Sequence, residues 1–79
     1  MNIIAKTASG SVYEFTYEKG RTFFRKGLIS GEVVRINNGA IRVGKSINMD
    51  FRKDGLYGTP DKCTMSLNTT PVTEIQVIL

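Results

Sequence analysis

The sequence predicts an all-β protein: a single small SH3-like or OB-like barrel of about six or seven short, mostly antiparallel strands. Three observations lead to this prediction. Apolar and polar residues alternate with a period of two, while a helical period is nearly absent. Turn-forming residues recur every several positions. Finally, a chain of 79 residues buries its apolar faces better in one closed sheet than in two flat ones, and closure removes the sheet edges.

The first third of the chain is expected to contain three strands, the last two of which form a hairpin. Asn2–Thr7 is a plausible first strand, ended by Ser9-Gly10. Ser11–Tyr17 is the clearest strand, because its aromatic residues alternate with polar ones. Glu18-Lys19-Gly20 reads as a turn, with glycine supplying a left-handed residue. Arg21–Lys26 continues as a strand paired with the preceding one.

The middle of the chain is expected to hold a second hairpin. Gly27 and Gly31 bracket a short bend. Glu32–Ile36 and Ala40–Val43 are then two strands on either side of Asn37-Asn38-Gly39. Asn-Gly between β-rich runs is the strongest short hairpin signal, since both residues tolerate a positive φ.

The last third alternates again and is divided by one long loop. Ile47–Arg52 is a further strand, followed by the turn-rich segment Asp54–Lys62. Cys63–Asn68 and Val72–Leu79 close the chain as two short strands around Thr70-Pro71. No linker or repeat divides the sequence, so residues 1–79 are expected to form one domain.

The positive charge is concentrated in one short stretch. The net charge is +4, and the segment Lys19–Ile29 carries four basic residues and no acid, so the remaining cations balance the acids elsewhere. This segment also holds the adjacent rings of Phe23 and Phe24. Basic side chains next to exposed rings suit a polyanion, because the charges meet phosphates and the rings stack on bases. A solvated edge strand that resists aggregation explains the same residues equally well.

Several other residues are candidates for the same surface. Phe23 and Phe24 point to opposite faces of an extended strand, so one is expected inside and one outside. Arg35 and Arg42 lie at similar distances from the expected Asn-Gly turn and are predicted to share a face. The full set of candidate binding residues is Lys19, Arg21, Phe23, Phe24, Arg25, Lys26, Arg35, Arg42 and Lys45.

The stripe of Tyr13, Phe15 and Tyr17 has two interpretations. Aromatic residues two positions apart stack successive bases in some single-strand-binding barrels. They can equally form the core, which is the interpretation favoured for Phe15. The two tyrosines stay undecided, since a phenol hydroxyl prefers a wet rim. Near the other end, Arg52 and Lys53 are expected to pair with the neighbouring carboxylates rather than to bind a partner.

The residues needed for catalysis or for a metal site are missing. The sequence has no histidine, and its carboxylates show no spacing that pairs them for acid–base work. Cys63 is the single cysteine, which excludes an internal disulfide and a Cys/His zinc site. Because Cys63 alternates with apolar residues, it is expected to be a small, buried apolar residue. The chain is therefore predicted to be no enzyme and to use no cofactor.

One formal motif match does not fit the expected secondary structure. The residues from Gly39 to Ser46 fit the phosphate-binding pattern G-x-x-x-x-G-K-[ST] letter for letter. That pattern works only where a glycine loop leaves a strand and opens a helix, so that backbone amides converge on phosphates. Here the residues after Ser46 alternate as a strand, and nucleotide binding is not expected.

The sequence also indicates a location. The N-terminal residues lack the basic and long apolar regions of a signal peptide, and no apolar run is long enough to span a membrane. A cytoplasmic protein without a membrane partner is the expectation.

Two short motifs resemble a known group of proteins. Ser9–Phe15 contains the pattern G-S-x-Y-E-hydrophobic, and Thr69–Ile75 contains T-[ST]-P-V-x-x-I. At these two ends the chain resembles small β-rich accessory proteins of phages and mobile elements. The resemblance implies a protein that acts by binding, such as an inhibitor of a host or defence factor, and it carries over no active-site residues.

Two functional hypotheses follow. In the first, the chain is a non-enzymatic accessory factor that inhibits or modulates a host protein or complex by protein–protein contact. In the second, the basic and aromatic edge binds nucleic acid, single strands rather than duplex. The sequence leaves the oligomeric state open, a homodimer included.

Overall fold

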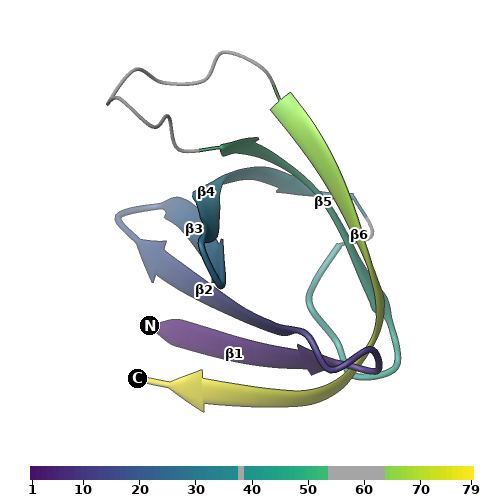
Figure 1. The fold of residues 1–79 in the computed structure, drawn as a ribbon. Coiled ribbons are helices and arrows are strands. Elements are labelled where there is room, and N and C mark those ends of the chain that lie inside the picture. The colour runs from purple at the N-terminus through teal and green to yellow at the C-terminus, as the bar shows by residue number, and fades with distance from the viewer. Residues whose placement is uncertain (38, 54–63) are drawn as a thin grey trace.

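Six antiparallel strands form a closed barrel in the computed structural model, which describes residues 1–37, 39–53 and 64–79 (Figure 1). The described residues include no helix, and therefore no helix that could cross a membrane. The predicted fold class, a small all-β barrel, is confirmed. In chain order the strands are β1 (Asn2–Thr7), β2 (Val12–Glu18), β3 (Arg21–Lys26), β4 (Ile29–Ile36), β5 (Ser46–Lys53) and β6 (Thr64–Ile78).

The strands follow one another around the barrel in sequence order. Each pairs antiparallel with the next, and β6 closes the sheet by pairing with β1. This is an up-and-down arrangement, whereas an OB-fold is a Greek-key barrel. The closure depends on the length and curvature of β6, whose first half pairs with β5 and whose second half pairs with β1 (Figure 1).

Pro71 lies where β6 changes partners. The sequence predicted two short strands separated at Thr70-Pro71, but β6 is one strand of 15 residues. Along β6, the pairing with β5 ends at the Ser46–Pro71 pair, and the pairing with β1 begins at Thr7–Val72. The register shifts at both points, and a register irregularity is where a sheet tolerates a residue without a backbone N–H. The proline therefore marks a bend in the strand and not its end.

The second predicted hairpin is wrong. The chain does turn after β4, where the Gly39 amide donates a 3.3 Å hydrogen bond to the Ile36 carbonyl. The expected strand Ala40–Val43 does not follow, because residues 40–45 belong to no named strand and β4 pairs with β5 instead. The connection caps the barrel instead: Ile41 packs against the core, and Val43 forms an isolated parallel bridge with Val72. The period-two pattern of this segment thus reflects one partly buried side chain and one bridge.

Other boundaries agree closely with the sequence. β1 and β3 have the predicted limits. The bend expected up to Gly31 is wrong, since β4 already begins at Ile29 and Gly31 pairs with Phe24 within it. The tight turn between β2 and β3 contains Lys19 and Gly20, with φ angles of 51° and 75°. Two left-handed residues match the right-handed twist of the flanking strands. The predictions for Asp54–Lys62 and Cys63 lie outside the described residues.

Alternate side chains of the strands fill the barrel. Phe15 lies at its centre, fully buried, as the sequence favoured. The rings of Phe24 and Phe51 meet edge to face with their centroids 4.7 Å apart. Gly31 faces Phe24 across the strand pair and adds no side chain there. Among the described residues, the buried apolar ones are Ala5, Tyr13, Phe15, Phe24, Val33, Ile47, Met49, Phe51 and Val72.

Candidate functional site

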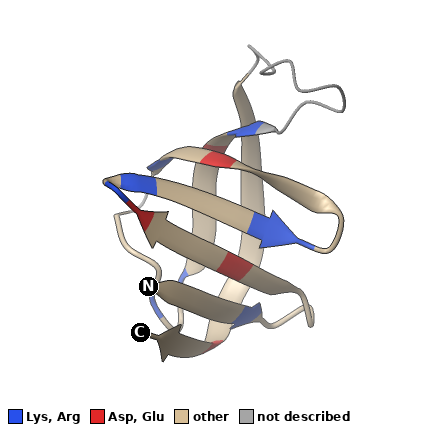
Figure 2. Ribbon diagram, turned by 90° about the vertical axis from the view of Figure 1, so that its left-hand side faces the viewer, with Lys and Arg blue, Asp and Glu red and all other residues tan. Residues whose placement is uncertain are grey.

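The predicted basic stretch is spread over the two faces of β3. Phe24 is 2% exposed and points into the core, so Phe23 is the ring on the outer face. Arg21 and Arg25 share that outer face with Phe23. Figure 2 shows the face that β1–β4 present, on which acidic positions of β2 and β4 flank the basic positions of β3. The charge is therefore mixed in space although it is separated in the sequence.

Arg21 is neutralised within the chain. Its Nε and Nη2 donate hydrogen bonds of 2.8 and 2.9 Å to the two carboxylate oxygens of Glu32, a bidentate ion pair between β3 and β4. The hydrogen bond from Arg21 is the main reason that the pKa of Glu32 lies below its usual value, and the nearby charge of Arg52 adds to this lowering. The same contact raises the pKa of Arg21. A phosphate would have to displace Glu32 to bind this arginine.

Phe23 is covered as well as half-buried. The guanidinium carbon of Arg21 lies 5.3 Å from the centroid of the Phe23 ring, a cation–π contact. Thr16 and Glu32 are its cross-strand neighbours. The ring thus lies beneath the ion pair, a poor position for stacking on a base.

Arg25 and Lys26 belong to different surfaces. Arg25 is on the outer face opposite Glu14, and its Nε donates a 3.5 Å hydrogen bond to the carbonyl of Gly27. Lys26 turns toward the end of the barrel, where its ammonium lies 5.4 Å from the centroid of the Tyr13 ring. Tyr13 is buried, which decides the question that the sequence left open for this residue, and Tyr17 is half-buried.

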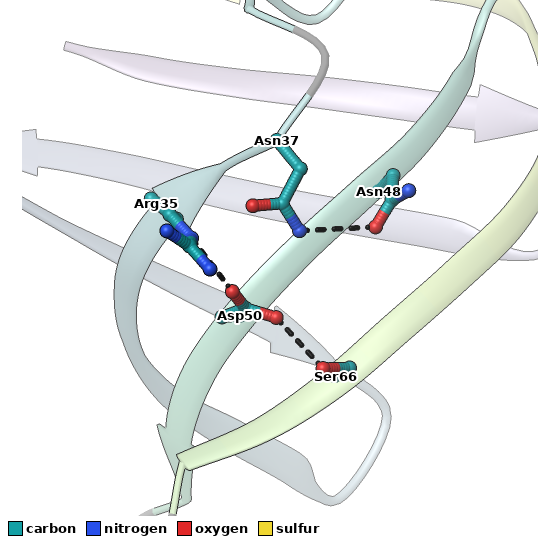
Figure 3. Close-up of polar contacts among 5 residues, drawn as sticks. All are labelled: Arg35, Asn37, Asn48, Asp50 and Ser66. Atoms are coloured by element: carbon teal, nitrogen blue, oxygen red, sulfur yellow. Dashed lines mark hydrogen bonds and ion pairs between the residues drawn. The ribbon is translucent and has the colours of Figure 1, made fainter.

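A polar cluster that the sequence did not predict connects β4, β5 and β6 (Figure 3). Asp50 receives a 2.7 Å hydrogen bond from the Ser66 hydroxyl and a 2.8 Å hydrogen bond from Arg35 Nε. These two bonds are the leading causes that hold the pKa of Asp50 below its usual value. Beside them, Asn37 Nδ2 donates to Asn48 Oδ1 over 3.2 Å. Arg35 is therefore a structural partner of Asp50.

The remaining predicted cations do not extend a shared face. Arg42 and Lys45 lie in the connection that caps the barrel, so Arg42 is not on a hairpin arm opposite Arg35. Lys19 occupies the β2–β3 turn. Ser46 begins β5, so no helix follows the glycine-lysine-serine sequence that matched the phosphate loop. Asp50 pairs across the strands with Arg35 and not with its sequence neighbour Arg52, and the pairing expected for Asp54 lies outside the described residues.

Several exposed side chains around the β3–β4 turn are aliphatic. Leu28 is 102% exposed and Ile29 is 43% exposed. The β2–β3 pairing ends at Glu14 and Arg25, so Val12 at the start of β2 lies at the same end of the barrel as this turn. Val12 is 46% exposed. We call Val12, Leu28 and Ile29 the turn cluster; the cations next to it are Arg25 and Lys26.

The described residues offer no metal site, and the comparisons with known proteins give no match. Among the described residues no three His, Cys, Asp or Glu side chains gather into a group that could hold a metal ion. Comparison of the chain with family models, with curated proteins and with solved structures gives no significant match.

Proposed function

We propose that this protein is a non-enzymatic binding protein that modulates a partner protein by direct contact, with the turn cluster as the centre of its interface. An accessory role against a host or defence factor, which the resemblance implies, is part of this proposal. The observation that carries it is the kind of side chain left exposed: aliphatic at the turn cluster, whereas the candidate stacking rings are buried, packed against the core or covered.

The turn cluster has the chemistry of a protein contact. Apolar side chains surrounded by polar or charged ones are the usual pattern of an interface core and its rim. Arg25 and Lys26 supply the charged rim, and no ion pair within the described residues occupies either of them. A complementary partner has an apolar pocket that receives Leu28 and acidic groups around its mouth.

The same geometry argues against nucleic acid. Single-strand binding needs aromatic faces on which bases stack. Phe24 and Tyr13 are in the core, and Phe23 lies under the Arg21–Glu32 ion pair. Two of the predicted phosphate-binding arginines, Arg21 and Arg35, are bound to carboxylates.

Site-specific photo-cross-linking tests the proposal. A photoreactive residue at position 28 is expected to cross-link a partner protein in nuclease-treated lysate of the native host. Leu28→Asp, assayed with the photoreactive residue moved to Ile29, is expected to abolish that product. Leu79→Asp is the matched control, because Leu79 is equally exposed at 101%. Since both side chains lie in solvent, each substitution changes the folding stability by less than about 0.5 kcal/mol.

Two outcomes would contradict the proposal. One is a cross-linking pattern that Leu28→Asp and Leu79→Asp change equally. The other is tight, steeply salt-dependent binding of a fluorescent single-stranded oligonucleotide, since counterion release is the signature of phosphate contacts. That second result would favour the nucleic-acid hypothesis instead.

A further inference from the structure

The pairing between β3 and β4 ends before the strands do. Their last paired residues are Phe23 and Glu32, yet β3 begins at Arg21 and β4 continues to Ile36. Continued pairing would have placed Thr22 opposite Val33. Both residues are paired on their other sides, with β2 and β5 respectively. The facing backbone edges of Thr22 and Val33 therefore have no ladder partner between β3 and β4.

A cleft of about 350 Å³ occupies this opening. Its walls are strand residues from β3, β4 and β5, together with Gly20 of the β2–β3 turn. Val34, the extra residue where the β4–β5 register shifts, lines the cleft and is 48% exposed. The full lining is Gly20, Arg21, Thr22, Glu32, Val33, Val34 and Arg52.

The charges in the cleft favour a carboxylate ligand. Glu32 lies between two arginines: Arg21 holds it in a bidentate pair, and Arg52 is its cross-strand neighbour on β5. Arg52 lowers the pKa of Glu32 through its charge, but it makes no ion pair with any residue that the structure describes. One negative charge between two positive ones leaves a net positive site, which a second carboxylate would balance.

We propose that this cleft binds an extended acidic peptide segment of a partner protein. The segment adds its backbone to the open edges of β3 and β4, and a Glu or Asp side chain pairs with Arg52. Strand addition supplies affinity through main-chain hydrogen bonds, while the neighbouring side-chain sites supply specificity. This inference rests on the proposed function only in taking the partner to be a protein, because the cleft and the turn cluster lie at opposite ends of β3.

A random octapeptide display library, selected on the purified full chain, tests the inference. We expect the selected peptides to be enriched in Glu or Asp and to shift the amide resonances of Thr22, Val33 and Val34. Arg52→Gln should weaken their binding about tenfold or more, as expected for the loss of a charged hydrogen bond. Arg52→Lys retains the charge and should keep most of the affinity. Arg42→Gln removes an exposed cation from the barrel-capping connection and should have no effect.

Three results would overturn the inference: no acidic enrichment, equal binding by wild type and Arg52→Gln, or peptide-induced shifts confined to the turn cluster. The last result would still agree with the proposed function, because it would place the partner at Leu28. An unchanged amide spectrum of Arg52→Gln away from the cleft shows that the variant is folded. Conversely, loss of the Leu28 cross-link leaves the library result unaffected, so each proposal fails separately.

Discussion

Adjacent phenylalanines with opposite surroundings provide the sharpest test of the fold. Phe24 is 2% exposed and meets Phe51 edge to face, whereas Phe23 is half-buried on the outer surface. Replacing a buried Phe by Ala typically costs about 3–5 kcal/mol, which includes the cavity left behind. A domain of this size has a net stability of only about 3–5 kcal/mol. Phe24→Ala is therefore expected to be largely unfolded at 25 °C.

Phe23→Ala is the matched comparison. Full burial of a Phe side chain contributes about 1.5–3 kcal/mol, so a half-buried ring loses about 1 kcal/mol on truncation. Urea unfolding followed by far-ultraviolet circular dichroism measures both variants, since the sequence has no tryptophan. Phe24→Leu keeps part of the side chain and should give an intermediate loss that can be measured even if Phe24→Ala does not fold.

A double-mutant cycle separates the ring contact from simple burial. Phe24→Leu and Phe51→Leu together should show a coupling free energy of about 0.5–1.5 kcal/mol. Equal destabilisation by Phe23→Ala and Phe24→Ala would refute the assignment of inside and outside faces on β3. Because the period-two alternation is shared along the strand, that result would also displace Arg21 and Arg25 from the outer face.

Three further predictions concern charge and backbone geometry. Because the folded-state pKa of Asp50 is lowered, its contribution to stability is present above the unfolded-state pKa of about 4 and is lost as the pH falls through the folded-state pKa. Urea unfolding from pH 7 to pH 2 should show this loss of stability, and Ser66→Ala and Asp50→Asn should each make the loss smaller. Lys19→Asn should raise the free energy of unfolding by up to about 1 kcal/mol, because Lys19 has a φ of 51° and asparagine tolerates the left-handed region better; a lower melting temperature would contradict this. Gly44→Ala should lower the free energy of unfolding by about 1–2 kcal/mol, because Gly44 has a φ of 87° although its surroundings have room for a Cβ atom; an unchanged thermal midpoint would count against it.

The local pattern predicted the strands well where one residue in two faces the core. The Tyr13-Phe15 alternation and the limits of β1 and β3 follow directly from the sequence. The Asn37–Gly39 signal predicted the turn correctly but not the hairpin, because a turn motif indicates only that the chain reverses locally. The partner of β4 is decided by burial: pairing with β5 brings Met49 and Phe51 into the core, which residues 40–43 could not match with one packed side chain, Ile41.

The two motifs that carry the resemblance meet in the structure. Ser9 of the first motif receives a 3.2 Å hydrogen bond from the Thr70 hydroxyl of the second, and the Ala8 amide donates to the Pro71 carbonyl over 2.9 Å. The polar residues of both motifs join the β1–β2 turn to the bend of β6. Their pattern has a structural explanation in this chain, namely closure of the barrel.

The candidate site was harder to predict because charge clustering in sequence differs from charge clustering on a sheet. The cations of β3 follow one another in the sequence, but their neighbours on the sheet come from β2 and β4. The strand register places Glu14 beside Arg25 and Glu32 beside Phe23. Glu32 is the decisive residue, because it neutralises Arg21 and leaves Arg52 as a cation of the cleft that has no ion pair with a described residue. Glu32→Gln would therefore free Arg21 and make the outer face more basic. If nucleic-acid binding rose sharply in that variant while wild type bound none, the ion pair itself would be what keeps this barrel from acting on polyanions.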